Sequence, residues 1–222
     1  MQYLNFYSVK AGDIIFTQNS GYSYRMEVWG GHTTGFKFEL EYTRAYIVCS
    51  TREASYVAKD AYELYPEPQT VTHMCHMSST KTRLFPWRAK ARFPGILFRT
   101  ADPTWAQGVA AIGKAWALAP LKHAGTLQAL RTAVLSCVPY TARAAEKAAA
   151  YRRLAASSLL SPQTTAKLFE NKKFVNSSFV AAVVQGASPP NSYWDKVRAA
   201  YVSPFSLQHH LSASGWEKFQ VS

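Results

Sequence analysis

The sequence predicts an α+β fold, in which a small antiparallel sheet or half-barrel packs against helices on one side. Short apolar or alternating runs bounded by turn residues fill the first hundred residues, a pattern typical of strands. From Asp102 onward, long segments are rich in strong helix formers. With 222 residues and 48% hydrophobic residues, the chain can fill the core of one domain. We therefore expect a single domain over residues 1–222, whose helical middle, about residues 101–170, is partly an insertion.

The strand predictions rest on short runs that begin or end at turn residues. The segment GDIIFTQ is an apolar run after a turn residue, and AYIVCS has the composition of a buried strand. One segment between strands, residues 56–66, is expected to form a short helix that ends at Pro66. The expected strands cover residues 12–18, 24–30, 32–42, 45–50, 70–79 and 95–100.

The helix predictions rest on start signals and on residues with high helix propensity. Asp102 followed by Pro103 is a typical N-terminus, with an acidic N-cap and proline at the first helical position. Two further segments begin with Ser-Pro, and another is rich in alanine. The expected helices cover residues 102–118, 139–160, 161–170, 176–186, 192–202 and 203–214.

The net charge of +12 favours an anionic partner, such as nucleic acid, an anionic membrane surface or a wall polymer. Between Glu67 and Glu146 the only acidic residue is Asp102. The most basic part, residues 81–99, interleaves aromatic residues with cations, so that aromatics could stack on bases while cations hold phosphates. The other interpretation is a solvated loop whose aromatics anchor it to the core. The candidate residues for binding an anionic partner are Arg88, Lys90 and Arg92.

The start of the chain lacks the regions of a secretory signal, and no apolar run is long enough to span a membrane. The chain has three cysteines, Cys49, Cys75 and Cys137. This number is small and odd, so it does not indicate a disulfide framework, and it fits a reducing compartment. We therefore expect a cytoplasmic protein, or one delivered by a non-classical route. His73 and Cys75 would share one face of a strand, but two ligands fall short of the four in a structural zinc site. Neither a metal nor a cofactor is expected.

The segment KFVNSSFVAAVVQG, residues 173–186, has the pattern of a helix that begins at Asn176. In a cysteine hydrolase we would expect cysteine there, because the positive end of the helix dipole favours a thiolate. Asparagine has no titratable proton, although its side-chain oxygen can cap a first helical turn. The apolar residues that line one face of the helix are Phe179, Val180, Val183 and Val184.

Four pieces follow one another along the chain: an opening GDIIF strand, His32 after two glycines, the Asn176 helix, and a closing Ser203-Pro204 helix start. This order resembles the circularly permuted branch of the papain-like NlpC-type cysteine hydrolases. The resemblance implies a papain-like (permuted NlpC-type) fold with a helical insertion. It also implies that His32 is the general base and that position 176 is the position of the nucleophile. The candidates for the polar residue that orients the histidine are Ser50 and Glu53.

The resemblance implies a hydrolase or acyltransferase that acts on an amide, peptide or (thio)ester bond and lacks its nucleophile in this chain. The substrate would be a peptide, an amide or an acyl compound. Three explanations of Asn176 stay open: an engineered inactive variant, a natural pseudoenzyme, or a false resemblance. Without any catalysis, Asn176 would simply cap an amphipathic helix. The alternative function is a non-enzymatic binding or structural protein that holds an anionic partner on a basic surface. If the resemblance holds, the side chains of His32 and Asn176 lie within hydrogen-bonding or one-water distance.

Overall fold

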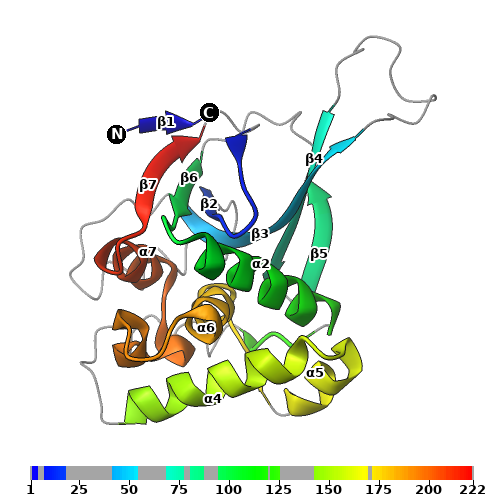
Figure 1. The fold of residues 1–222 in the computed structure, drawn as a ribbon, viewed down its shortest axis with the longest axis vertical. Coiled ribbons are helices and arrows are strands. Elements are labelled where there is room, and N and C mark those ends of the chain that lie inside the picture. Colours follow the sequence, from blue (N-terminus) through cyan, green and yellow to red (C-terminus); the bar gives the residue numbers. More distant parts are fainter. Residues whose placement is uncertain are drawn as a thin grey trace.

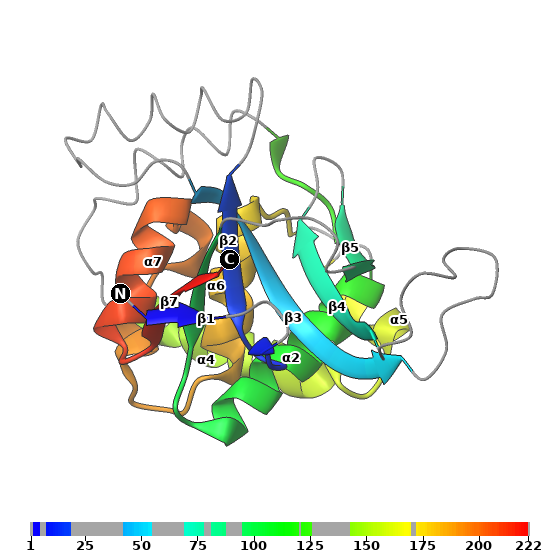
Figure 2. The same cartoon turned by 90° about the horizontal axis from the view of Figure 1, so that it is seen from above.

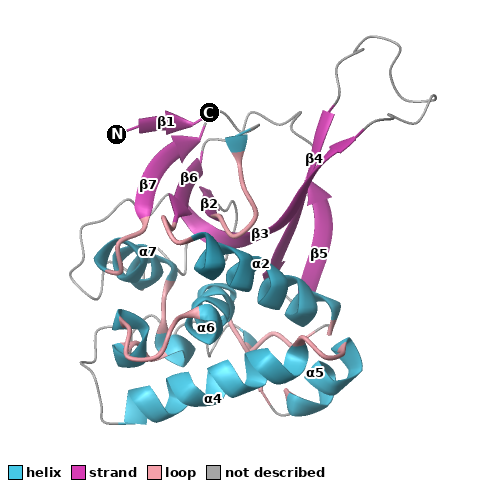
Figure 3. Ribbon diagram, in the orientation of Figure 1, coloured by secondary structure: helices cyan, strands magenta, loops and turns pink. Residues whose placement is uncertain are grey.

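The fold combines one sheet with a group of helices and is of the α+β class (Figure 3). The computed structural model describes residues 2–4, 8–18, 42–54, 69–77, 81–87, 95–119, 121–125, 143–169 and 172–221. The strands are β1 (Gln2–Leu4), β2 (Ile14–Gln18), β3 (Tyr42–Ala54), β4 (Gln69–Met77), β5 (Thr82–Trp87), β6 (Gly95–Arg99) and β7 (Glu217–Val221). The α-helices are α2 (Pro103–Leu118), α4 (Arg143–Ser158), α5 (Pro162–Leu168), α6 (Asn176–Ala187) and α7 (Pro204–Ala213), and the 3-10 helices are η2 (Tyr193–Lys196) and η3 (Ala199–Tyr201).

The described strands form one 7-stranded sheet in the order β1-β7-β6-β2-β3-β4-β5. β1 is parallel to β7, and every other neighbouring pair is antiparallel. The long strand β3 is strongly curved (Figure 2), and its register with β4 shifts between Val48 and Ser50. An irregularity of this kind bends a strand and increases its twist. The predicted α+β class is confirmed at this level, as a mainly antiparallel sheet with helices.

The helices α2 and α6 lie against one face of the sheet, and α4 and α5 lie beyond them (Figure 1). Because successive side chains of a strand point to opposite faces, each central strand contributes to two apolar clusters. Ile14, Phe16 and Ile47 belong to the main core together with α2 and α6, whereas Ile15 and Val48 belong to a cluster on the other face. The centre of the sheet is therefore buried on both sides, which explains the continuous apolar runs in the sequence.

Four of the predicted strands are confirmed and correspond to β2, β3, β4 and β6. The predictions for residues 24–30, 32–41 and 56–66 lie outside the described residues. The sequence pattern does not predict β1 or β7, which are short strands near the two ends of the chain and pair with each other. Their pairing is a long-range contact, so no local turn signal announces it.

The interpretation of residues 81–99 as a solvated loop is wrong for Thr82–Trp87, which form strand β5. This strand pairs with β4, with Pro86 opposite His73, and it stands last in the order of the described strands. Edge strands tolerate proline and charged residues, because one side of their backbone makes no ladder hydrogen bonds. The proline and the cations of this segment therefore do not exclude a strand.

The starts of three helices are confirmed as predicted. The carboxylate of Asp102 accepts hydrogen bonds from the backbone N–H groups of Thr104 at 2.8 Å and Trp105 at 3.2 Å. The hydroxyls of Ser161 and Ser203 accept from the first turns of α5 and α7. These side chains satisfy N–H groups that have no partner inside the helix. None of the described helices has both the length and the apolar character needed to cross a membrane.

The predicted helix over residues 192–202 is wrong, because this segment forms η2 and η3, which Val197 and Arg198 separate, and the backbone of Val197 is extended. Gln185 of α6 donates from Nε2 to the carbonyl oxygens of Trp194 at 2.6 Å and Val197 at 2.9 Å. The Trp194 carbonyl also accepts from the Val197 N–H at 3.2 Å, which closes a 3-10 turn, and the buried Gln185 side chain takes the place of further helical partners. The tertiary contact therefore replaces the local helix.

The Gly12-Asp13 pair shapes the turn before β2. Gly12 has a φ of +91°, and a Cβ at this position would lie 2.3 Å from the carbonyl oxygen of Ala106, so only glycine fits. The Asp13 carboxylate accepts from Nε and Nη2 of Arg99 at 2.8 and 2.6 Å and from the Lys10 N–H at 2.7 Å. Burial raises the pKa of Asp13, and Arg99 and the Lys10 N–H only partly offset this effect. The motif therefore has a structural role in holding the sheet against α2.

Candidate functional site

Asn176 is the first residue of α6, and the N-cap is Val175, so the interpretation of Asn176 as a helix cap is wrong. The Val175 N–H donates to Oγ of Ser178 at 2.9 Å. The Ser177 hydroxyl donates to the carbonyl oxygen of Val202 at 2.6 Å. Because neighbouring serines fix the start of the helix, the Asn176 side chain is available to contact the sheet.

The Asn176 side chain connects β3 to β4. Its Oδ1 accepts a hydrogen bond from the Ala45 N–H at 2.7 Å, and its Nδ2 donates to the carbonyl oxygen of Met77 at 3.1 Å. The paired register of the two strands begins at Ile47 and Cys75. Continuing that register by two residues places Ala45 opposite Met77. The side-chain amide therefore joins the strands just beyond their last backbone pair.

The two backbone partners of Asn176 require an amide. The Ala45 N–H needs an acceptor and the Met77 carbonyl needs a donor, and asparagine presents one of each on separate atoms. The partners also fix which end of the amide is oxygen. A cysteine at this position would have one sulfur atom, which is a weak donor and a weak acceptor. The residue in the expected nucleophile position is thus held at both ends by the backbone of the sheet.

The candidates for orienting the histidine lie further along β3 than the residue that contacts Asn176. His32 lies outside the described residues, so its approach to Asn176 stays a prediction. Ser50 and Glu53 lie on β3, five and eight residues after Ala45. A strand advances about 3.3 Å per residue, so β3 carries both residues away from the start of α6. The role of orienting the histidine stays unassigned.

Two buried thiols lie on neighbouring strands of the core. Cys49 and Cys75 are free and buried. Burial, and then the neighbouring Cys49, raises the pKa of Cys75 well above its ordinary value. A buried neutral thiol is unreactive, so Cys75 does not have the properties of a nucleophile. Within the described part of the chain, no group of three or more His, Cys, Asp and Glu side chains could hold a metal ion.

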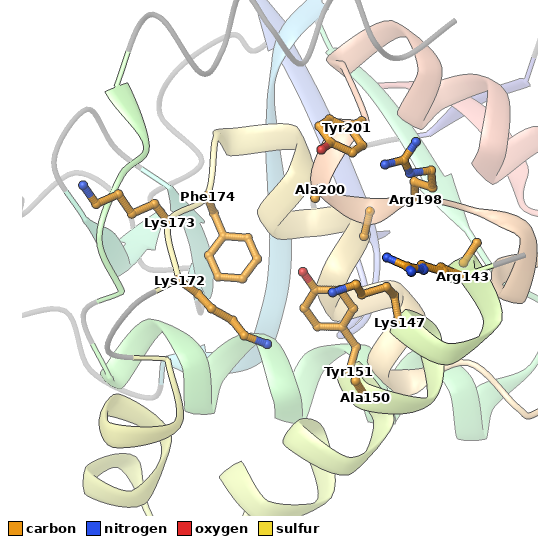
Figure 4. A pocket seen from close by; sticks show the side chains of 12 residues that line it. Arg143, Lys147, Ala150, Tyr151, Lys172, Lys173, Phe174, Arg198, Ala200 and Tyr201 are labelled. Atoms are coloured by element: carbon orange, nitrogen blue, oxygen red, sulfur yellow. The ribbon is translucent and has the colours of Figure 1, made fainter. Parts of the chain in front are cut away.

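A cavity of about 450 Å³ lies between α4, the segment that leads into α6, and η3 (Figure 4). Every charged side chain among its described lining residues is a cation. The cations are Arg143, Lys147, Lys172, Lys173 and Arg198, and the aromatic residues are Tyr151, Phe174 and Tyr201. We call this cavity the basic pocket.

The basic pocket differs from the anion-binding stretch that the sequence predicts. Arg88, Lys90 and Arg92 lie outside the described residues, and their role stays a prediction. One local signal for the pocket is present in the sequence: Arg143, Lys147 and Tyr151 are spaced by four and therefore share a helix face. The other lining residues come from distant segments, which sequence patterns do not bring together.

Two histidines make the fold sensitive to acid. Burial, followed by the charges of Arg44 and Arg83, lowers the pKa of His76 to about 4. Burial, followed by His209, lowers the pKa of His210 to about 4 as well. An unfolded histidine titrates near pH 6.5. As the pH falls from about 6.5 to about 4, the unfolded chain binds protons that the folded chain does not, so the free energy of unfolding decreases.

We expect the double variant His76→Gln, His210→Gln to lose less stability than the wild type between about pH 7.5 and pH 4.5, by about 1–2 kcal/mol per histidine. Urea unfolding at both pH values measures the difference. His209→Gln removes an exposed neighbour whose charge adds to the lowered pKa of His210, so it should reduce the pH dependence by much less than the double variant does. If the free energy of unfolding depends on pH equally in the wild type and the double variant, His76 and His210 are not the source of the acid sensitivity.

Comparisons with protein-family models, with curated proteins and with solved structures found no match to this chain.

Proposed function

We propose that the chain is a non-catalytic binding protein that keeps the layout of a permuted NlpC-type papain-like hydrolase and holds an anionic partner. The observation that carries this proposal is the double hydrogen bond of the Asn176 amide to Ala45 and Met77. An amide lacks the activatable hydroxyl, thiol or amine of a catalytic nucleophile. Here both polar groups of the amide also serve to join two strands. A structural role for position 176 supports binding over catalysis as the activity of the chain.

The charge of the chain supports an anionic partner. The net charge is +12, and every charged side chain among the described residues of the basic pocket is a cation. A concentration of one sign of charge in a cleft raises the local concentration of the opposite charge and speeds association. The candidate partners are negatively charged: nucleic acid, an anionic membrane surface and a wall polymer.

A second candidate function is the hydrolase or acyltransferase itself, acting on a peptide, amide or acyl substrate, with Asn176 as an engineered replacement for cysteine. The position of Asn176 in the first turn of α6 favours it, because the helix dipole would lower the pKa of a thiol there. The two candidates differ in what the site is built for. A site built for cysteine does not depend on an amide to join β3 and β4.

Binding measurements test the proposed function. The protein is titrated at low and moderate salt into three anionic partners. These are a labelled single-stranded oligonucleotide, vesicles rich in anionic lipid, and an anionic wall polymer. If about four cations contact phosphates, the Kd for the oligonucleotide should rise on the order of 100-fold between roughly 50 and 200 mM salt. Absence of binding to all three anions at low salt would contradict the proposed function.

The variant with Arg88, Lys90 and Arg92 all changed to glutamine locates the binding surface. If that stretch contacts the polyanion, the variant should bind more weakly and with a flatter salt dependence. An unchanged salt dependence would exclude the stretch and leave the basic pocket as the candidate surface.

A further inference from the structure

Four cationic side chains converge on the basic pocket from three segments that are far apart in the sequence. Arg143 and Lys147 extend from one face of α4, Lys172 precedes α6, and Arg198 precedes η3. Figure 4 shows Lys172 reaching toward the ring of Tyr151. Its neighbour Lys173 extends in the opposite direction, so four of the five cations belong to one cluster.

The pocket cations differ from the cations that hold the fold together. Within the described residues, the ion pairs join Arg99 to Asp13 and Arg152 to Asp195. Arg152 lies on α4, like two of the pocket cations, and it also donates to the carbonyl oxygen of Ser188 at 2.9 Å. The described ion pairs include none of the pocket cations. The cluster therefore keeps positive charge that the described carboxylates do not neutralise.

Aromatic rings support the cations and form a wall of the pocket. Nζ of Lys172 lies 5.2 Å from the ring centroid of Tyr151, and Cζ of Arg198 lies 4.3 Å from that of Tyr201. Burial, and then the charge of Lys147, lowers the pKa of Lys172. Burial raises the pKa of Tyr151 to about 12, so its hydroxyl keeps its proton at neutral pH. An anion between the two lysines would relieve their repulsion.

We propose that the basic pocket binds a compact ligand that carries two neighbouring phosphate groups, with its organic part against the aromatic wall. One phosphate monoester carries roughly 1.5–2 negative charges at neutral pH, so four cations match two phosphates. The volume of about 450 Å³ falls in the range of small-molecule sites. A nucleoside diphosphate and an inositol phosphate both supply this chemistry. The inference rests on the proposed function, because both require an anionic partner.

Calorimetric titration with inorganic pyrophosphate is the primary test, and ADP, inositol trisphosphate and adenosine are the further arms. We expect saturable binding of pyrophosphate and no comparable binding of adenosine. Tighter binding of ADP than of inositol trisphosphate identifies a nucleoside diphosphate, and the reverse identifies an inositol phosphate. Either order supports the phosphate site. Adenosine binding as tightly as ADP would overturn it.

Charge-removing variants locate the binding within the pocket. Lys147→Gln and Lys172→Gln should each weaken pyrophosphate binding about tenfold or more, as expected for a charge-assisted hydrogen bond. Lys167→Gln removes the same charge from an exposed side chain of α5 outside the pocket lining, and it should change the Kd by less than about twofold. Lys147 is exposed, so its variant should fold normally, and thermal unfolding checks this for all three. If the three variants weaken pyrophosphate binding equally, or if none weakens it, the basic pocket is not the phosphate site.

The outcomes separate this inference from the proposed function. If the wild type binds an anionic polymer or vesicle but no pyrophosphate, only the pocket assignment fails. If it binds pyrophosphate and the lysine variants remove that binding, the pocket stands whichever polymer binds elsewhere.

Discussion

Replacing Asn176 by alanine is expected to lower the free energy of unfolding by about 2–4 kcal/mol, because each backbone group left without a partner costs about 1–3 kcal/mol. The two groups are the Ala45 N–H and the Met77 carbonyl, which the Asn176 amide now joins. Urea unfolding measures the change. Gln163→Ala removes an exposed amide from α5 and is the control, with an expected change within about 0.5 kcal/mol. An Asn176→Ala variant as stable as this control would contradict the structural role.

The variant Asn176→Asp tests the donor half of the same contact. An ionised aspartate can still accept from the Ala45 N–H, but it places a second acceptor beside the Met77 carbonyl oxygen. A protonated aspartic acid can donate to that oxygen, so folding favours the protonated form and raises the carboxyl pKa above its ordinary value. The variant should have a lower free energy of unfolding than the wild type at neutral pH. This difference should become smaller as the pH falls through the raised pKa of the carboxyl group. A deficit that does not depend on pH would show that Met77 needs no donor.

A thiol introduced by Asn176→Cys is expected to react with iodoacetamide at least about tenfold faster at pH 7 than an ordinary cysteine, which is only a few per cent thiolate there. The reason is its place in the first turn of α6, where the helix dipole favours the thiolate. The buried thiols Cys49 and Cys75 are internal controls and should react more slowly. Mass spectrometry of the alkylated peptides gives each rate.

The same experiment tests the papain-like layout through His32. If His32 is the general base of that layout, adding His32→Ala should remove much of the reactivity of the introduced thiol. A thiol that reacts at the rate of Cys49 and ignores His32 would contradict the layout. It would leave the structural role of Asn176 untouched, because that role rests on Ala45 and Met77.

The sequence predicts the elements whose signals are local. The start of α2 at Asp102-Pro103 and the start of α6 at Asn176 are read from neighbouring residues, and the structure confirms both. The predicted helix over residues 192–202 fails because Gln185 bonds to carbonyls of that segment. Strand β5 is missed because its proline and cations are typical of a loop, and only its pairing with β4 makes it a strand.

The candidate site is less predictable than the fold, because its contacts join distant segments. Asn176 is identified from the sequence as the unusual residue, but its partners Ala45 and Met77 lie 131 and 99 residues away. The basic pocket combines α4 with Lys172 and Arg198 in the same manner. The spacing of Arg143, Lys147 and Tyr151 by four predicts one wall of the pocket. The other lining residues come together only in the folded chain.

The free energy of unfolding of Asn176→Cys relative to the wild type is the most direct test of the central claim, that position 176 is built for an amide. Measured by urea unfolding under reducing conditions, the cysteine variant is expected to be less stable by about 1–3 kcal/mol, because one sulfur atom cannot serve both the Ala45 N–H and the Met77 carbonyl. A cysteine variant as stable as the wild type, or more stable, would contradict the claim, since a site built for a cysteine nucleophile would give that result.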